Sequence, residues 1–306
     1  MKPPHIALAL MIALIWGFTF ITAKIGVTHF PPIFFTFLRF GTVAVLMLPW
    51  LKIMPGRMRE VLVIALFAGA VHFGLLYSGM ALSPKLSSVA VLIQLGAPFS
   101  VIVAYFWLKE TVGWARVAGI ALSFIGVLLL GFDPAVFSEP VGALLVVAGA
   151  FSMSFAMLMM RRLRNVGVLE LQAWIAAVAA PIALIASLVF ESGQFDEFAD
   201  PSWQAIGAIL YTAIATSIVG HGGWYWLLQR YKVGQVTGFG LLPPVLAVVF
   251  GVIVFDEAVT WKLVVACVLV TSGLAIITLW REKQSNEKAA APLPPLGVKE
   301  AAPAAE

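Results

Sequence analysis

Residues 241–257 read "LLPPVLAVVFGVIVFDE", an apolar stretch with two adjacent prolines near its start. A proline inside a helix removes one backbone hydrogen bond and clashes with the preceding turn. In lipid no water replaces that bond, so a broken helix is tolerated only against protein or a wet cavity. Pro243 and Pro244 therefore predict a helix that is interrupted inside a membrane.

The composition of the whole chain supports a membrane setting. Apolar residues make up 61% of the 306 residues, charged residues 11%, and the mean hydropathy is +1.00. A soluble domain has about 25% charged residues, so the sequence predicts an all-α integral membrane protein. The net charge of +4 is spread between apolar runs, which excludes nucleic acid as a partner and leaves membrane lipid. Cys267 is the single cysteine, so neither a disulfide nor a cysteine-based metal site is expected.

A bilayer core needs about 20 apolar residues per helix. The breaks at charges and at Pro or Gly clusters predict ten transmembrane helices, near 6–27, 33–51, 60–82, 86–108, 114–131, 141–160, 168–190, 204–228, 234–255 and 262–280. The first apolar run is too long for a signal peptide and is interpreted as a retained span. Residues 282–306 are rich in Ala, Pro, Lys and Glu and are expected to form a disordered cytoplasmic tail.

The charges in the loops predict how the chain is oriented. Alternate loops carry most of the Lys and Arg, for example at Arg57, Arg162 and Arg230, whereas the loop at 191–200 is acidic. Since positive loops face the cytoplasm, both termini are expected to be cytoplasmic. The predicted location is the inner (plasma) membrane.

The chain also repeats itself. "PFSVIVAYFWLKETVGWARVAGIALSFIGVLLL" (98–130) aligns with "VLAVVFGVIVFDEAVTWKLVVACVLVTSGLAII" (245–277). Three residues recur at one offset of 147 positions: Glu110 as Glu257, Trp114 as Trp261 and Gly126 as Gly273. Each half contains five spans, so the second must cross the membrane in the opposite sense. The predicted domains are repeat 1 (1–135) and repeat 2 (136–281), inverted as in secondary transporters.

Several segments together resemble the EamA family of the drug/metabolite transporter superfamily. They are "IWGFTFITAKIG", "FLRF" and "PFSVIVAYFWLKE" in the first half, with "ATSIVGHGGWYWLLQRY" and "LLPPVLAVVFGVIVFDE" in the second. The resemblance covers about residues 1–281 and implies two inverted five-helix repeats. It also implies transport of amino acids or their derivatives, other metabolites or drugs, usually outward. Some relatives instead handle lipid-linked intermediates or nucleotide sugars.

Polar and helix-breaking residues near the middle of the spans define the predicted substrate cavity. Pro98 stands at the centre of the fourth span as Pro243 and Pro244 do in the ninth, and matched breaks in two halves point to a transporter's binding site. Plain kinked packing is the alternative. Spans one, three, four, six, eight and nine are expected to wall the cavity, with spans five and ten at the periphery. Its candidate residues are Trp16, His72, Gln94, Pro98, Ser152, Thr216, His221, Pro243 and Pro244, with Ser154 and Ser217 beside them.

Each polar candidate has a structural alternative. Ser and Thr in a span often bond a carbonyl of their own helix, Trp16 could serve packing alone, and Gln94 could bond a neighbouring helix. His72 is the candidate for proton coupling because an ionisable group at that depth is functional by default, although a neutral His bonded between helices is the alternative. Arg39, nearer the outer surface, either snorkels to the interface or attracts a substrate carboxylate.

The absence of mid-membrane acids limits the mechanism. Glu60, Glu110, Glu170 and Glu257 all lie at span ends, so a carboxylate proton relay or Na⁺ site has no residue to form it. Proton coupling would fall to His72 or His221, and uncoupled transport fits equally well.

The predicted function is export of amino acids or related small metabolites by alternating access, without a cofactor, by a monomer or homodimer. A flippase for a lipid-linked intermediate is the nearer alternative. An intramembrane enzyme is disfavoured, because no His-Glu metal motif, carboxylate pair or Ser/His/Asp signature occurs.

Overall fold

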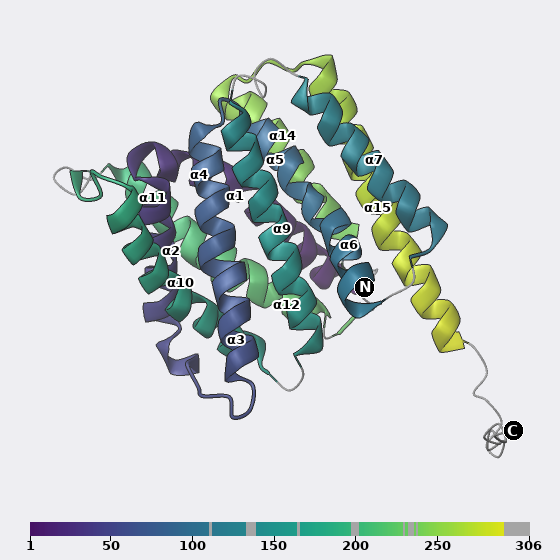
Figure 1. The fold of residues 1–306 in the computed structure, drawn as a ribbon, viewed down its shortest axis with the longest axis horizontal. Coiled ribbons are helices and arrows are strands. Elements are labelled where there is room, and N and C mark those ends of the chain that lie inside the picture. The colour runs from purple at the N-terminus through teal and green to yellow at the C-terminus, as the bar shows by residue number, and fades with distance from the viewer. Residues whose placement is uncertain are drawn as a thin grey trace, which may run out of the picture.

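The computed structural model describes residues 1–109, 112–132, 139–163, 166–196, 202–228, 230–231, 236 and 238–290. In this part of the chain six helical segments are long and apolar enough to cross a membrane, and four shorter apolar helices accompany them. Together these segments match the ten predicted spans, so the predicted all-α membrane architecture is confirmed. Figure 1 shows the bundle that they form.

The first five spans are built from the following elements. They are α1 (Pro3–His29), α2 (Pro32–Leu46), α3 (Met58–Ala65) with η2 (Leu66–Val71) and α4 (His72–Leu82), α5 (Leu86–Leu92) with η3 (Ile93–Leu95) and α6 (Gly96–Leu108), and α7 (Trp114–Gly131). A short 3₁₀ turn, η1 (Leu48–Trp50), follows α2.

The other five spans repeat this order. They are α9 (Pro140–Arg162), α10 (Val168–Phe190), α11 (Trp203–Leu210) with η5 (Tyr211–His221) and α12 (Gly222–Leu228), η6 (Gly238–Leu241) with α14 (Leu242–Phe255), and α15 (Trp261–Ala290). The α15 helix extends past 280 into the segment predicted as tail, because residues 281–290 are mostly good helix formers. Residues 291–306 lie outside the described part.

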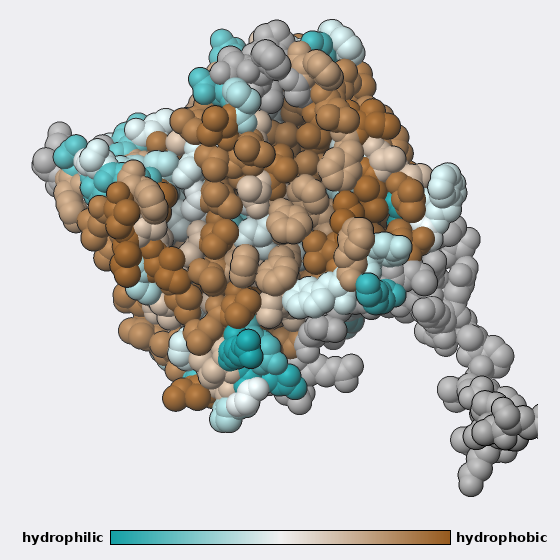
Figure 2. All heavy atoms as spheres, viewed as in Figure 1, coloured by the Kyte–Doolittle hydropathy of each residue, from teal (hydrophilic) through white to brown (hydrophobic). Residues whose placement is uncertain are grey.

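The surface of the bundle is mostly apolar, unlike the surface of a soluble protein. Figure 2 shows apolar residues over most of the visible face, with hydrophilic residues towards its upper and lower edges. Large apolar side chains are more than half exposed on many helices, for example Leu128, Leu144, Ile185 and Ile253. Exposed apolar area on this scale marks contact with lipid.

The contact between α7 and α15 shows that the two repeats are inverted. These helices lie side by side at one edge of the molecule (Figure 1). A Cβ added to Gly119 would lie 2.8 Å from the carbonyl oxygen of Gly273, and one added to Gly126 would lie 3.0 Å from that of Ala266. The residue numbers run in opposite directions, so the helices are antiparallel. Adding 147 to Gly119 and Gly126 gives the positions of Ala266 and Gly273, so the two contacts are equivalent under the repeat. The small residues at these positions allow the helices to approach closely.

The same offset appears in backbone geometry. Lys109 ends α6 with φ 54°, and Asp256 ends α14 with φ 51°. These are the only non-glycine residues with positive φ in the described segments. A left-handed residue is a common helix terminus, and its recurrence shows that both halves fold alike.

The fourth and ninth spans are both interrupted, but the prolines start new helices rather than kink continuous ones. A 3₁₀ turn, η3, precedes α6, where Pro98 occupies the first turn, and η6 precedes α14, which opens on Pro243 and Pro244. Proline is well tolerated in a first turn, where its missing N–H would lack an intrahelical partner anyway. The predicted matched breaks are therefore present, each just ahead of its prolines.

The third and eighth spans share a feature that the sequence did not reveal. In each, eight α-helical residues lead into a π-helical segment: α3 into η2 and α11 into η5. His72 follows the first segment directly and His221 ends the second. Since π-helical turns are rare and frequently found at functional sites, their matched occurrence draws attention to both histidines.

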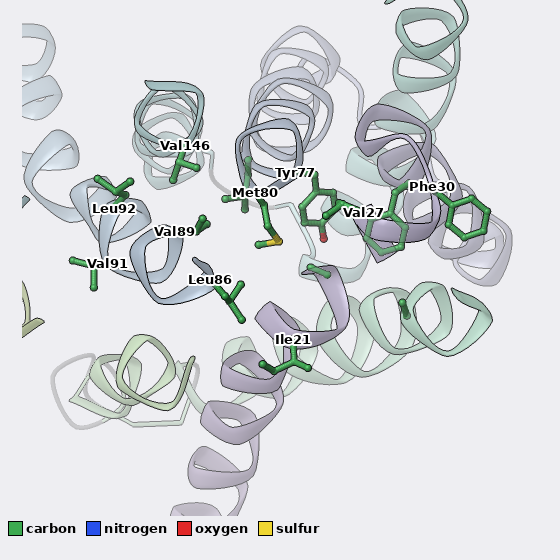
Figure 3. Close-up of a cluster of buried hydrophobic side chains, with 14 of the residues drawn as sticks. Ile21, Val27, Phe30, Tyr77, Met80, Leu86, Val89, Val91, Leu92 and Val146 are labelled. Atoms are coloured by element: carbon green, nitrogen blue, oxygen red, sulfur yellow. The ribbon is translucent and has the colours of Figure 1, made fainter. Parts of the chain in front are cut away.

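Each repeat packs its first helix into the other repeat. The α9 helix lies against α4, η2 and α6 of repeat 1, whereas α1 lies against α11, η5 and α14 of repeat 2. Figure 3 shows part of the resulting core, where Ile21, Tyr77, Met80, Val89 and Val146 come from four different helices. The two repeats are thereby interlocked rather than merely adjacent.

Charged residues at the helix ends stabilise this arrangement. Glu257 accepts hydrogen bonds from the backbone N–H groups of Leu86 and Ser87, where α5 begins. Glu191 does the same for Ile33 and Phe34 at the start of α2. Carboxylates are favourable at helix N-termini, so both acids have a structural role at span ends, where they were expected.

Lys24 provides the opposite interaction at a helix C-terminus. Its Nζ donates to the carbonyl oxygens of Met80 and Ser83, both at 2.8 Å, at the end of α4. The lysine therefore joins the first and third spans and does not simply reach for the membrane surface.

Candidate substrate site

The α9 cluster comprises the middle of α9, the η2–α4 junction and the start of α6. Ser152 Oγ donates to the carbonyl oxygen of Phe67 in η2 at 2.7 Å. Nδ1 of His72 lies 2.8 Å from the carbonyl oxygen of Gly149, to which it can only donate. The Ser152 bond supplies a partner from another helix to a backbone carbonyl of the π-helical segment, and the His72 bond ties the segment's end to α9.

The broken fourth span completes the α9 cluster. Ser154 Oγ donates to the carbonyl oxygen of Gly96, at the start of α6, and to that of Ala150 in its own helix, both at 2.7 Å. Pro98, two residues beyond Gly96, is buried. The interrupted backbone therefore rests on α9, as a break in lipid requires.

The α1 cluster is the counterpart in the other half: the middle of α1, η5 and the start of α14. The hydroxyls of Thr19 and Thr216 are 2.6 Å apart, and Tyr211 Oη donates to the carbonyl oxygen of Ile15 at 3.1 Å. The Trp16 and His221 rings lie 5.4 Å apart between centroids.

The second broken helix packs into the α1 cluster through a glycine. A Cβ on Gly17 would lie 2.6 Å from Cβ of Leu246 and 3.5 Å from the carbonyl oxygen of Pro243. Only glycine permits this approach of α1 to the start of α14. Pro243 and Pro244 are both buried there.

Arg39 joins the two clusters. Its guanidinium donates through Nη1 to Tyr77 Oη in α4 and through Nη2 to Ser217 Oγ in η5, the latter at 3.1 Å. The guanidinium carbon also lies 4.1 Å from the ring centre of Phe73. Arg39 is 1% exposed, which contradicts the snorkelling alternative and leaves attraction of a carboxylate as a prediction. The side chain points into the protein, where aromatic faces and hydroxyls stabilise its charge.

Every predicted cavity residue lies in or beside one of the two clusters. The α9 cluster contains His72, Gln94, Pro98 and Ser152. The α1 cluster contains Trp16, Thr216, His221, Pro243 and Pro244. Gln94, in the η3 turn, is half-buried and makes no hydrogen bond with its side chain among the described residues. Its side chain is thus available to a ligand.

The sequence left open whether the Ser and Thr hydroxyls of these spans simply bond carbonyls of their own helix, and the four hydroxyls differ in this respect. Ser154, Thr216 and Ser217 each reach a carbonyl in their own segment. All three also contact another helix, whereas Ser152, as far as the described residues show, bonds only another helix. These hydroxyls therefore connect different spans in addition to bonding carbonyls of their own helix.

Sequence reasoning missed four participants: Thr19, Tyr77, Tyr211 and Trp224. Trp224 lies 5.0 Å from Trp16 between ring centroids. Thr19 lies three residues from Trp16 along α1, so helical periodicity could have indicated it. Tyr77 lies five residues from His72, the nearest candidate on its span, and that spacing gives no such signal. Tyr211 lies five positions before Thr216, a spacing that places both residues on one face of a π-helix but not of an α-helix.

Two interlocked, inverted repeats with matched helix breaks are the architecture of secondary transporters. The EamA-like transporter family matches residues 4–132 and 140–279, and the chain belongs to this family. The family assignment made from sequence motifs is thus confirmed.

Similar proteins agree with this class. A probable amino-acid metabolite efflux pump of Escherichia coli (strain K12) is 27% identical over 88% of this chain and 93% of its own length. The uncharacterized transporter YoaV of Bacillus subtilis (strain 168) is 23% identical over 87% and 94%. A solved crystal structure with 20% identity superposes with a TM-score of 0.63, covering 93% of this chain and 99% of the other, and supports the fold.

Proposed function

We propose that this protein exports amino acids or related small metabolites across the inner membrane by alternating access. The observation that carries the proposal is the pair of matched clusters. In each, a π-helical span and a broken span of one repeat pack on the first helix of the other repeat. A substrate bound between the clusters would be exposed to one face or the other as they move against each other.

The substrate class is supported by the chemistry of the two clusters. Indole rings, hydroxyls, an amide and a guanidinium suit a small zwitterion with an apolar part. The relative in Escherichia coli is named as a probable amino-acid metabolite efflux pump, which agrees with this choice. Both termini would lie in the cytoplasm.

The π-helical segments are the proposed hinges. In η5, Thr216 and Ser217 satisfy backbone carbonyls five residues earlier, and in η2 Ser152 of α9 satisfies that of Phe67. Exchanging such side-chain bonds for water or substrate costs little compared with breaking α-helical ladders. The third and eighth spans could therefore bend at matched depths.

Export can be tested by comparing cells that overproduce the protein with cells lacking it. Amino acids or related metabolites should accumulate outside the overproducing cells, as measured by mass spectrometry of the medium. Purified protein in liposomes should release the same compounds, whereas protein-free liposomes should not. Lack of release by the reconstituted protein would contradict the proposal.

A further inference from the structure

Three buried nitrogen atoms around the two clusters have no hydrogen-bond partner: Arg39 Nε, Trp16 Nε1 and His221 Nδ1. In the described part of the chain, the other buried side-chain polar atoms without one belong to Glu60, Ser87 and Arg116, outside both clusters. The carbonyls of Thr216 and Ser217 lie close to the His221 ring, but neither forms a well-aligned hydrogen bond with Nδ1. Buried groups are normally paired, so a concentration of unpaired nitrogens needs an explanation.

The unpaired atoms are connected through the structure. Arg39 donates to Ser217, which lies four residues before His221 in η5. The His221 ring in turn lies beside the Trp16 ring at an angle of 51°, and a Cβ on Gly220 would lie 2.6 Å from Trp16 Nε1. The chain of contacts from Arg39 to Trp16 therefore passes through one side of η5.

The charge of this region is not balanced by the described residues. Arg39 is surrounded by Tyr77, Ser217 and aromatic rings, and no carboxylate in the described segments contacts it. Glu191 and Glu257 are occupied at helix N-termini. A buried cation without an anion is unfavourable in a membrane protein and marks a functional site.

We propose that Arg39, His221 and Trp16 form a subsite for a carboxylate of the transported substrate, an inference that rests on the proposed transport function. A carboxylate accepts several hydrogen bonds at once and neutralises a guanidinium, so it satisfies both the unpaired donors and the charge. Trp224, beside Trp16, gives the apolar part of the same molecule an aromatic surface. The substrate class is therefore an amphipathic compound with a free carboxylate rather than one that lacks it.

This subsite would also connect substrate binding to movement. Arg39 contacts α4 of one cluster and η5 of the other. A carboxylate that binds the guanidinium competes with the Ser217 hydroxyl for its N–H groups. Binding thus weakens the contact between the clusters, which alternating access requires.

The test compares acids with their amides in one assay. Proteoliposomes are loaded with L-leucine, L-phenylalanine and L-threonine together with leucinamide, phenylalaninamide and threoninamide, and released compounds are quantified by mass spectrometry. Wild-type protein should release at least one acid about tenfold or more faster than its amide, as expected for loss of a charge-assisted hydrogen bond. Arg39→Gln should remove this preference, and Trp16→Phe, which keeps an aromatic ring but lacks Nε1, should reduce it.

Arg57→Gln is the matched control, because Arg57 is exposed and, among the residues the structure describes, pairs with Glu60 one turn away. It should keep the wild-type preference. If Arg39→Gln fails to fold, the proposal is decided by the acid-to-amide release ratio of wild-type protein and by the change of that ratio in Trp16→Phe. Equal release of acids and amides by wild-type protein would overturn the carboxylate subsite while leaving transport intact. Release of no compound above protein-free liposomes would overturn the transport function itself and the subsite with it.

Discussion

Arg39 Nη2 donates to Ser217 Oγ at 3.1 Å, joining the second span of one repeat to the eighth span of the other. Ser217 also donates to the carbonyl oxygen of Thr212, one π-helical turn earlier. The hydroxyl thus connects a buried cation to the proposed hinge of η5. Both residues are almost completely buried, so water cannot easily replace the bond.

Ser217→Ala is expected to destabilise the protein by about 1–3 kcal/mol, because it leaves a buried donor without a partner. Thermal unfolding in detergent measures the change. Ser100→Ala is the matched control and should change stability less, since within the described segments Ser100 bonds only the Gly96 carbonyl of its own helix. Equal stability of wild type and Ser217→Ala would show that the bond contributes nothing.

Pro98→Ala and Pro244→Ala are expected to leave stability nearly unchanged, within about 1 kcal/mol, because both prolines stand in first turns of helices. Flux in liposomes should nevertheless fall, because alanine allows the helix to extend backwards over the break. Pro140→Ala, at the start of α9 on the exposed surface, should leave flux normal. Normal flux in all three variants would mean that the breaks serve packing only.

The fold followed from the sequence because apolar length, loop charge and the 147-residue repeat each constrain it independently. The breaks near Pro98 and Pro244 could also be predicted, because proline has one dominant effect on a helix: it interrupts it. The π-helical segments could not be predicted, since Leu66–Val71 and Tyr211–His221 have no distinctive composition. For Arg39 the sequence left two alternatives open, because distance along a span says nothing about which way its side chain points.

His72→Gln tests proton coupling. Glutamine can still donate a hydrogen bond towards the Gly149 carbonyl, which His72 now contacts at 2.8 Å, but it does not titrate near neutral pH. If His72 carries a coupled proton, transport by the variant should lose its pH dependence and keep some downhill flux. The profile is measured in liposomes across pH 5 to 8, about the range in which histidine titrates. A profile like that of wild type would assign His72 to packing and direct attention to His221.

Topology can be tested in a Cys267→Ala background. Gln194 is unsuitable as a labelling site, because its side chain is buried and bonds the end of α10. Ser192 and Arg59 are exposed at opposite ends of the bundle's spans. A membrane-impermeant maleimide applied outside cells should label Ser192→Cys and spare Arg59→Cys. The reverse pattern would contradict cytoplasmic termini.

The central claim is that the two clusters enclose a site open to each face in turn, and Gln94 offers the most direct test. It lies in the break of the fourth span, half-buried and without a side-chain hydrogen bond in the described structure. The measurement is labelling of Gln94→Cys, without Cys267, by an impermeant maleimide applied to either face of oriented membrane vesicles. Alternating access predicts labelling from both faces, with the ratio shifted by transported substrate. Protection from both faces, while Ser192→Cys is labelled normally from one, would contradict the account.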